Sequence, residues 1–163
     1  HQENLYDLTV INTVAYDFWP VQPIIAMRTP IIRQLAMATL DLGTFRLIVK
    51  RGLYHKEKCT DELMNLFWKP MKTSEGRKAF LHFAHCLDNR NLTDISDKLH
   101  QLKIPVKIIR GDADLYLSRE IAIQLNKNIQ GSQLKLIETA GHFIQEDEPE
   151  LLSKEILEFI EKK

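Results

Sequence analysis

The chain has 163 residues, of which 44% are hydrophobic, so it can bury a core of ordinary domain size and is not a disordered protein. Its 22 basic and 22 acidic residues cancel, which argues against nucleic acid or an anionic membrane as a partner. The first residues are polar, and no apolar run reaches the length of a signal segment or a membrane span. We therefore expect a cytoplasmic protein.

The N-terminal part of the sequence predicts one strand and a loop. Leu8–Ile11 is an apolar, strand-like run that begins only a few residues into the chain. Residues 12–23 contain Asp17 and two prolines, which is typical of a loop that leaves a strand. The chain therefore opens on a strand that has no other predicted strand close to it in the sequence.

Residues 24–100 have apolar side chains at helical spacing, and we expect several helices there. Pro70 should end the second of these helices, because proline cannot continue a helix. Ser74 is the expected cap of the third helix, and Thr93 or Asp94 of a short fourth one. This part of the chain is predicted to be entirely helical.

The C-terminal part returns to alternating elements. An apolar run, residues 105–109, ends at Gly111 and predicts a buried strand, and residues 134–137 predict another. Ser118 should cap the helix between these strands, and a final helix should start near Pro149. Strands that alternate with helices in this order imply an α/β fold with parallel strands and right-handed crossovers.

Two loops that follow predicted strands carry a possible acid and a possible base. Asp114 lies in the loop after the strand that ends at Gly111, and His142 lies in the loop after residues 134–137. Parallel strands place their following loops at one edge of the sheet, where ligands bind. Taken singly, Asp114 could be a turn residue and His142 a hydrogen-bonded loop histidine. Together they predict a carboxylate that orients a general-base histidine.

The motifs around these two residues resemble those of the α/β-hydrolases. Residues 104–114, IPVKIIRGDAD, are similar to the family pattern I-P-x-x-x-x-x-G-x-x-D, which contains the seventh strand and the catalytic acid. Residues 136–150, LIETAGHFIQEDEPE, are similar to the segment that carries the catalytic histidine. Residues 8–20 resemble the sixth strand and its exit towards the cap. The likeness points to the subgroup of haloalkane dehalogenases, epoxide hydrolases and carbon–carbon bond hydrolases.

This resemblance implies a partial α/β-hydrolase fold of about three parallel strands, the sixth to the eighth of the family, with flanking helices. Residues 1–20 and 103–163 would form the partial core, and residues 21–102 would form a helical cap, or lid, over the site. His142 and Asp114 would be the catalytic base and acid. Asp17, which follows the first strand, is a reserve candidate for the acid, because some related hydrolases hold it there. The family chemistry needs no cofactor and no metal.

The sequence departs from the family in lacking a nucleophile. None of its five serines lies in a G-x-S-x-G turn, and an aspartate or cysteine version of that turn is also absent. The glycine-rich oxyanion loop is missing too. In family terms the chain begins after the nucleophile helix, so we expect it to be inactive alone. The parent enzyme would hydrolyse a small ester, halide, epoxide or carbon–carbon substrate.

Several alternatives stay open at this point. The aromatic residues Phe18, Trp19, Phe67 and Trp68 are expected to pack in the core, although they could line an apolar pocket. The cysteines, Cys59 and Cys86, and the histidine pair, His82 and His85, have no metal-ligand spacing, and we expect free thiols and no metal site.

The family strands that this chain lacks lead to an expectation about its partners. The strand near Leu8–Ile11 would have a free edge, which predicts a homodimer through this strand or through exchanged cap helices, or an N-terminal half bound in trans. The alternative function is a non-enzymatic dimeric binding protein built on a half hydrolase fold. The chain could also be a piece of a longer enzyme.

Overall fold

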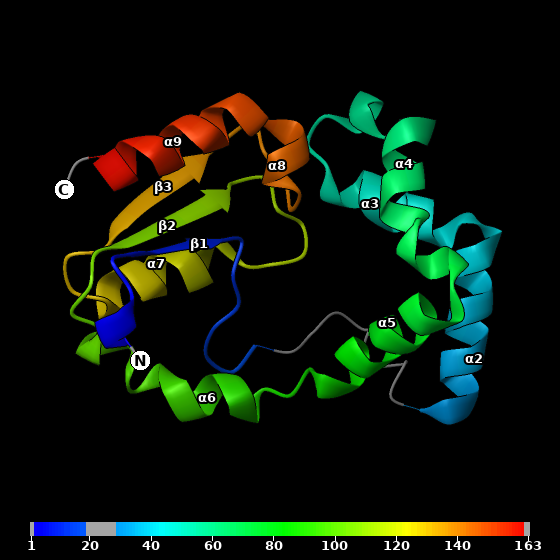
Figure 1. Cartoon of the computed structure of the whole chain (residues 1–163), viewed down its shortest axis with the longest axis horizontal. Helices are drawn as coiled ribbons and strands as arrows, with labels where there is room; N and C mark the ends of the chain where they lie inside the picture. Colours follow the sequence, from blue (N-terminus) through cyan, green and yellow to red (C-terminus); the bar gives the residue numbers. More distant parts are fainter. Residues whose placement is uncertain (1, 19–28, 162–163) are drawn as a thin grey trace.

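A computed structural model describes residues 2–18 and 29–161 of the chain. Its centre is a parallel three-stranded sheet of order β1-β2-β3 (Figure 1). The strands are β1 (Leu8–Ile11), β2 (Val106–Gly111) and β3 (Gln133–Ile137). Leu8 aligns with Val106, and Gly111 aligns with Ile137. The parallel α/β arrangement predicted from the sequence is confirmed, and β1 pairs with a strand almost a hundred residues further along the chain.

The helices follow in chain order. Among the described residues, five longer ones lie between β1 and β2, namely α2 (Pro30–Thr39), α3 (Phe45–Gly52), α4 (Asp61–Trp68), α5 (Ser74–Cys86) and α6 (Arg90–Ser96). After β2 come α7 (Arg119–Asn128), α8 (Ile144–Asp147) and α9 (Pro149–Glu161). A short turn of helix, η1 (Gln2–Asn4), precedes β1. Other short turns follow the longer helices: η2 (Leu40–Thr44), η3 (Lys56–Lys58), η4 (Pro70–Lys72) and η5 (Leu99–Gln101).

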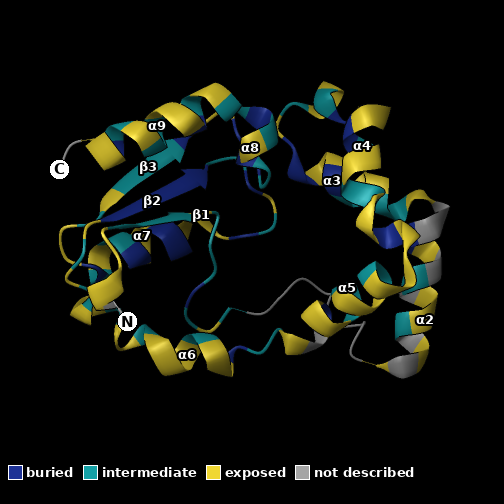
Figure 2. Cartoon of the chain, viewed as in Figure 1, coloured by how far each residue is buried: buried dark blue, intermediate teal, exposed yellow. Residues whose placement is uncertain are grey.

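The sheet is covered by helices on both faces, with α7 below it and α9 above it in Figure 1. All six residues of β2 are buried (Figure 2). Because side chains alternate along a strand, Ile108 packs in the cluster that contains Leu125 of α7, whereas Ile109 packs in the cluster that contains Leu152 of α9. The central strand is therefore the most deeply buried part of the molecule. We call the three strands with α7, α8 and α9 the sheet region.

Helices α2 to α5 and the turns between them lie beside the sheet, and α6 leads back beneath it (Figure 1). We call α2 to α6, with the turns between them, the helical region. It has small apolar clusters of its own. One contains Leu40, Met71 and Ala84, and another contains Val49 and Leu53, together with further apolar residues. Within the described residues, no helix has the length and apolarity that crossing a bilayer would require.

Two expected helix starts differ from the structure. The hydroxyl of Thr73, not Ser74, caps α5 by accepting the backbone N–H of Gly76, because Thr73 has the extended backbone that a cap requires. Helix α6 begins at Arg90 rather than after Thr93 or Asp94. The expected cap of α7 is confirmed, since the hydroxyl of Ser118 accepts the N–H of Glu120.

Candidate active site

Asp114 and His142 lie together at the carboxyl edge of the sheet. Gly111 and Ile137 are the last aligned pair of β2 and β3, so the loops that leave these two strands start side by side. The ring nitrogen Nδ1 of His142 lies 2.9 Å from Oδ2 of Asp114. The structure thus brings together the acid and the histidine that the sequence singled out.

The loop after β2 holds the Asp114 carboxylate from both sides. Its Oδ1 accepts the backbone N–H groups of Tyr116, at 2.7 Å, and Leu117, at 3.2 Å, which leaves Oδ2 for His142. The side chain is fully buried, and the guanidinium of Arg110 lies 3.8 Å away. Burial acts to raise the pKa of this carboxyl, but the hydrogen bonds from His142 and from the two backbone groups outweigh it, so the pKa of Asp114 lies below its usual value. The acid is therefore ionised at neutral pH.

An ionised carboxylate determines which nitrogen of His142 carries the proton. Since Asp114 can only accept hydrogen bonds, Nδ1 must be the donor, and the neutral ring then has its lone pair on Nε2. The His142 side chain is 30% exposed, so the ring is open to an incoming group. This arrangement can withdraw a proton at Nε2 and can stabilise the resulting imidazolium through Asp114.

Two aromatic rings pack against the imidazole. Tyr116 and Phe143 both meet His142 edge to face, with ring centroids 5.2 Å away. The Tyr116 hydroxyl donates to the carbonyl of Ile48 in α3, at 2.6 Å, and Phe143 contacts Phe67 of α4. The rings that flank the histidine are therefore fixed by the helical region.

Sequence reasoning missed one polar residue that joins the strand ends. Asn12 directly follows β1 and has a φ of 40°, which asparagine tolerates better than most residues. Its amide Nδ2 donates to the carbonyls of Gly141 and His142, at 3.0 and 2.7 Å, and its Oδ1 accepts the N–H of Gly111 at 3.0 Å. Asn12 thus connects all three strands beneath the histidine. Its position immediately after a predicted strand was the one feature of the sequence that could have marked Asn12 as a residue of the site.

Two glycines allow the loops to approach each other closely. A Cβ atom on Gly111 would lie 2.2 Å from the carbonyl oxygen of Gly141, and one on Gly141 would lie 2.3 Å from the carbonyl oxygen of Gly52. Backbone atoms cannot move aside as a flexible side chain can, so glycine is required at both positions. These contacts explain why the glycine motifs surround the acid and the histidine.

The other residues singled out in the sequence lie apart from this pair. Oδ1 of Asp17 accepts the side-chain amide of Asn89 at 2.8 Å, just before α6. Phe18 packs on the cluster beneath the sheet, and Trp68 packs against Phe45. Trp19 lies outside the described residues. Asp17 thus links the loop after β1 to the helical region, while Asp114 holds the histidine.

The described part of the chain contains no group of three or more histidine, cysteine or acidic residues that could hold a metal. Cys59 is buried and Cys86 is exposed, and both are free thiols. Nε2 of His82 lies 3.5 Å from the sulfur of Cys86. No described feature of these residues adds a metal or a cofactor to the site.

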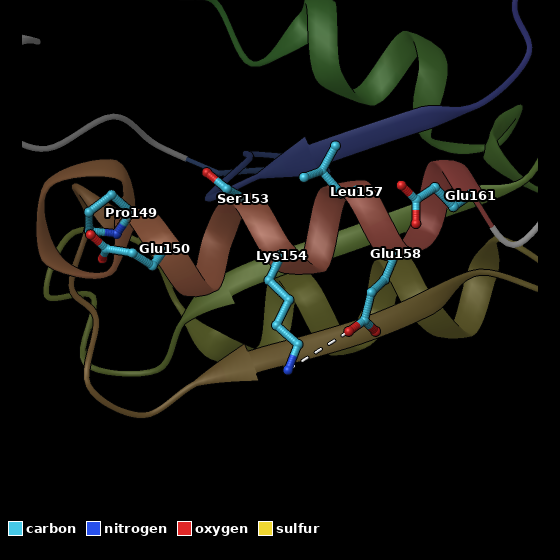
Figure 3. Close-up of a pocket in the computed structure, with 7 residues that line it drawn as sticks. All are labelled: Pro149, Glu150, Ser153, Lys154, Leu157, Glu158 and Glu161. Atoms are coloured by element: carbon cyan, nitrogen blue, oxygen red, sulfur yellow. Dashed lines mark ion pairs between the residues drawn. The ribbon is translucent and has the colours of Figure 1, made fainter.

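A shallow hollow follows the outer surface of α9 (Figure 3). It is lined only by residues of that helix, including Ser153, Leu157 and the ion pair of Lys154 with Glu158. Neither Asp114 nor His142 contributes to it. The hollow is therefore separate from the acid–histidine pair.

Comparison with known proteins identifies the fold. No model of a known protein family matches the chain. It is 38% identical over 61 residues to epoxide hydrolase 1 of Caenorhabditis elegans, a match that covers 37% of this chain and 15% of that protein. It is 25% identical over 139 residues to the uncharacterized hydrolase YugF of Bacillus subtilis, covering 75% and 50%.

A solved α/β hydrolase fold protein from Burkholderia ambifaria superposes with a TM-score of 0.80 at 22% identity, covering 94% of this chain and 56% of that one. The chain thus has part of the α/β-hydrolase fold, as the resemblance implied, and it spans about half the length of these proteins or less.

Proposed function

We propose that this chain, which has part of the α/β-hydrolase fold, supplies the base and the acid of a hydrolytic site. The observation that carries the proposal is the 2.9 Å contact between His142 Nδ1 and an ionised, buried Asp114 at the carboxyl edge of the sheet. His142 Nε2 takes the proton of the attacking group, and Asp114 stabilises the imidazolium. The proton then passes from Nε2 to the leaving group or is released to water.

The nucleophile is proposed to come from polypeptide outside these 163 residues, together with the N–H groups that stabilise the oxyanion. The sequence has no nucleophile turn of the family type. If the nucleophile is a serine, His142 would remove its hydroxyl proton as it attacks the substrate. If it is an aspartate, the carboxylate would attack directly, and His142 would activate the water that hydrolyses the covalent intermediate. The proposed substrate is a small ester, halide, epoxide or carbon–carbon compound, and the 163 residues alone should have negligible turnover.

The helical region within residues 21–102 is proposed to be the cap of this site. Two described contacts support this role. The backbone N–H of His142 donates to the carbonyl of Gly52 at the end of α3, at 2.6 Å, and Tyr116 beside the imidazole donates to Ile48. The helical region thus touches the histidine loop directly (Figure 1). Such a cap would exclude water from the reacting groups and select the substrate by shape.

The test compares the 163-residue chain with the product of the longest reading frame that includes it. Both are assayed with a chromogenic short-chain ester. We expect turnover only from a product that supplies a nucleophile, and a loss of about 10³-fold or more on His142→Gln or Asp114→Asn in that product. Turnover by the 163 residues that survives His142→Gln would refute the proposal.

The free edge of β1 is proposed to pair with another strand. In the described residues β1 is an edge of the sheet, and Ile11 at its end is 37% exposed. An uncovered strand edge presents unpaired backbone groups that favour association. The partner would be a second copy of the chain, through β1 or exchanged cap helices, or an N-terminal half in trans. If the partner is a second copy, light scattering after size exclusion should show a dimer. A stable monomer would exclude the homodimer and leave the N-terminal half as the proposed partner.

A further inference from the structure

Asp147 is a buried carboxylate that the acid–histidine pair does not use. It is the last residue of α8, five positions after His142, and only 1% of its surface is exposed. Its Oδ2 accepts the backbone N–H of Gly141 at 2.8 Å. It also accepts the N–H of Tyr54, at 2.8 Å to Oδ2 and 3.0 Å to Oδ1, and the N–H of His55, at 2.9 Å to Oδ1. One carboxylate thus receives three backbone donors.

These donors belong to two segments that are far apart in the sequence. Gly141 immediately precedes His142, whereas Tyr54 and His55 follow α3 in the helical region. The same two segments are joined again by the ammonium group of Lys58, which donates to the carbonyls of Glu146 and Asp147 at 3.0 and 2.5 Å. We call this set of contacts, between residues 52–58 and 141–147, the clasp.

The clasp holds the backbone that leads into His142. The N–H of Gly141 donates to Asp147, and the N–H of His142 itself donates to the carbonyl of Gly52. On the other side of the residue, the carbonyl of His142 accepts from Asn12. A side chain projects from its backbone, so the clasp restricts where the imidazole can lie. The acceptor is buried, so water cannot easily replace these hydrogen bonds, and an N–H group that lost its partner here would be left unsatisfied.

We propose that Asp147 is a positioning residue, which keeps His142 Nδ1 on Asp114 by tying the histidine loop to the end of α3. The inference rests on the proposed role of His142 as the base. The helical region would then also help to position His142, because two of the three donors to Asp147 come from there. A displacement of the segment after α3 should weaken the contact between His142 Nδ1 and Asp114.

The substitution Asp147→Asn tests this role with almost no change of shape. Oδ1 accepts from Tyr54 and His55, and Oδ2 accepts from Tyr54 and Gly141. An amide has one accepting oxygen and one donating NH₂ group, so in either orientation the NH₂ group faces backbone donors. The clasp must therefore open on the Gly141 side or on the His55 side.

The measurement is the ¹⁵N spectrum of the histidine rings in the 163-residue chain, with the His142 signals assigned from a His142→Gln variant. In the wild type we expect the neutral ring to carry its proton on Nδ1. Asp147→Asn should lower the ratio of this tautomer to the other about tenfold, as expected for losing one hydrogen bond. Glu150→Gln, the same carboxyl-to-amide change at an exposed position at the start of α9, should leave the ratio unchanged.

A folded Asp147→Asn variant with wild-type circular dichroism and unchanged His142 signals would overturn the proposal, because Asp147 would then be merely structural. If this variant does not fold, Lys58→Met loosens the clasp from its other side. It should change the tautomer ratio in the same direction, and an unchanged ratio there would also overturn the proposal.

The spectrum requires no turnover, so the two proposals can fail separately. A shifted tautomer in Asp147→Asn, combined with an extended product that hydrolyses substrate regardless of His142, would remove the proposed function and keep the positioning role. The opposite result, activity that depends on His142 together with an unchanged tautomer, would remove only the role of Asp147.

Discussion

The sheet region and the helical region differ in how deeply their elements are buried. Every residue of β2 is buried, with helices on both faces of the sheet (Figure 2). The helical region keeps large apolar side chains in solvent, among them Ile31 at 74%, Leu66 at 69% and Leu47 at 67% exposure. The sheet region also exposes Leu115 and Leu157, at 60% and 55%. The difference therefore lies in the fully buried central strand of the sheet region, for which the helical region has no counterpart among the described residues.

The difference explains where the acid–histidine pair lies. Asp114 and His142 both follow strands of the sheet region, and hydrogen bonds from backbone groups and from Asn12 fix their loops. Within the described residues, the helical region reaches the same place through α3, the end of α4 and the turn that follows α3. The sheet region thus holds the acid–histidine pair, and the helical region adjoins it.

The largest expected change in the free energy of unfolding comes from a core substitution, made once in each region. Ile109→Ala, at a fully buried position of β2, should lower the free energy of unfolding by about 4 kcal/mol, because neighbours on both sides prevent the cavity from closing. Met71→Ala in the helical region should lower it by about 2 kcal/mol, because the smaller cluster can relax. Urea unfolding of both variants checks this. Equal losses would show that the helical region is as rigidly packed as the sheet region.

A smaller effect is expected at the junction of the three strands. Asn12→Ala removes the side-chain contacts with Gly111, Gly141 and His142, and it places alanine at a φ of 40°. The free energy of unfolding should fall by about 2 to 3 kcal/mol. Asn12→Gly separates the two causes, since glycine accepts this backbone conformation and lacks only the hydrogen bonds. A loss below about 0.5 kcal/mol for Asn12→Ala would contradict the connecting role.

The smallest effect concerns pH. The pKa of folded Asp114 lies below its unfolded value, so its ionisation stabilises the fold above the unfolded pKa of about 3.9, and this contribution is lost as the pH falls through the folded pKa. Asp114→Asn lacks the titrating group. The difference in unfolding free energy between wild type and variant should therefore shrink between about pH 6 and about pH 2. A difference that grew with acid would reverse the assigned direction.

The sequence predicted the site by means of short-range patterns. The runs that end at Gly111 and Ile137 predicted the two strands, and parallel pairing then required that Asp114 and His142 follow at the same edge. The helix starts were less certain, because side chains such as Thr73 and Ser74 compete for one cap and only the backbone angles decide between them. Patterns of this kind identify elements better than they identify the ends of elements.

What the sequence determined by itself was the order of the elements, the parallel sheet, and the presence of an acid and a histidine in two loops that meet at one edge of the sheet. The tertiary structure alone decided that Asn12 joins three strand ends and that Asp147 ties the histidine loop to the segment after α3. The physical reason is separation along the chain. Asn12 meets His142 across 130 positions, and Tyr54 meets Asp147 across 93, so no local pattern of residues records either contact.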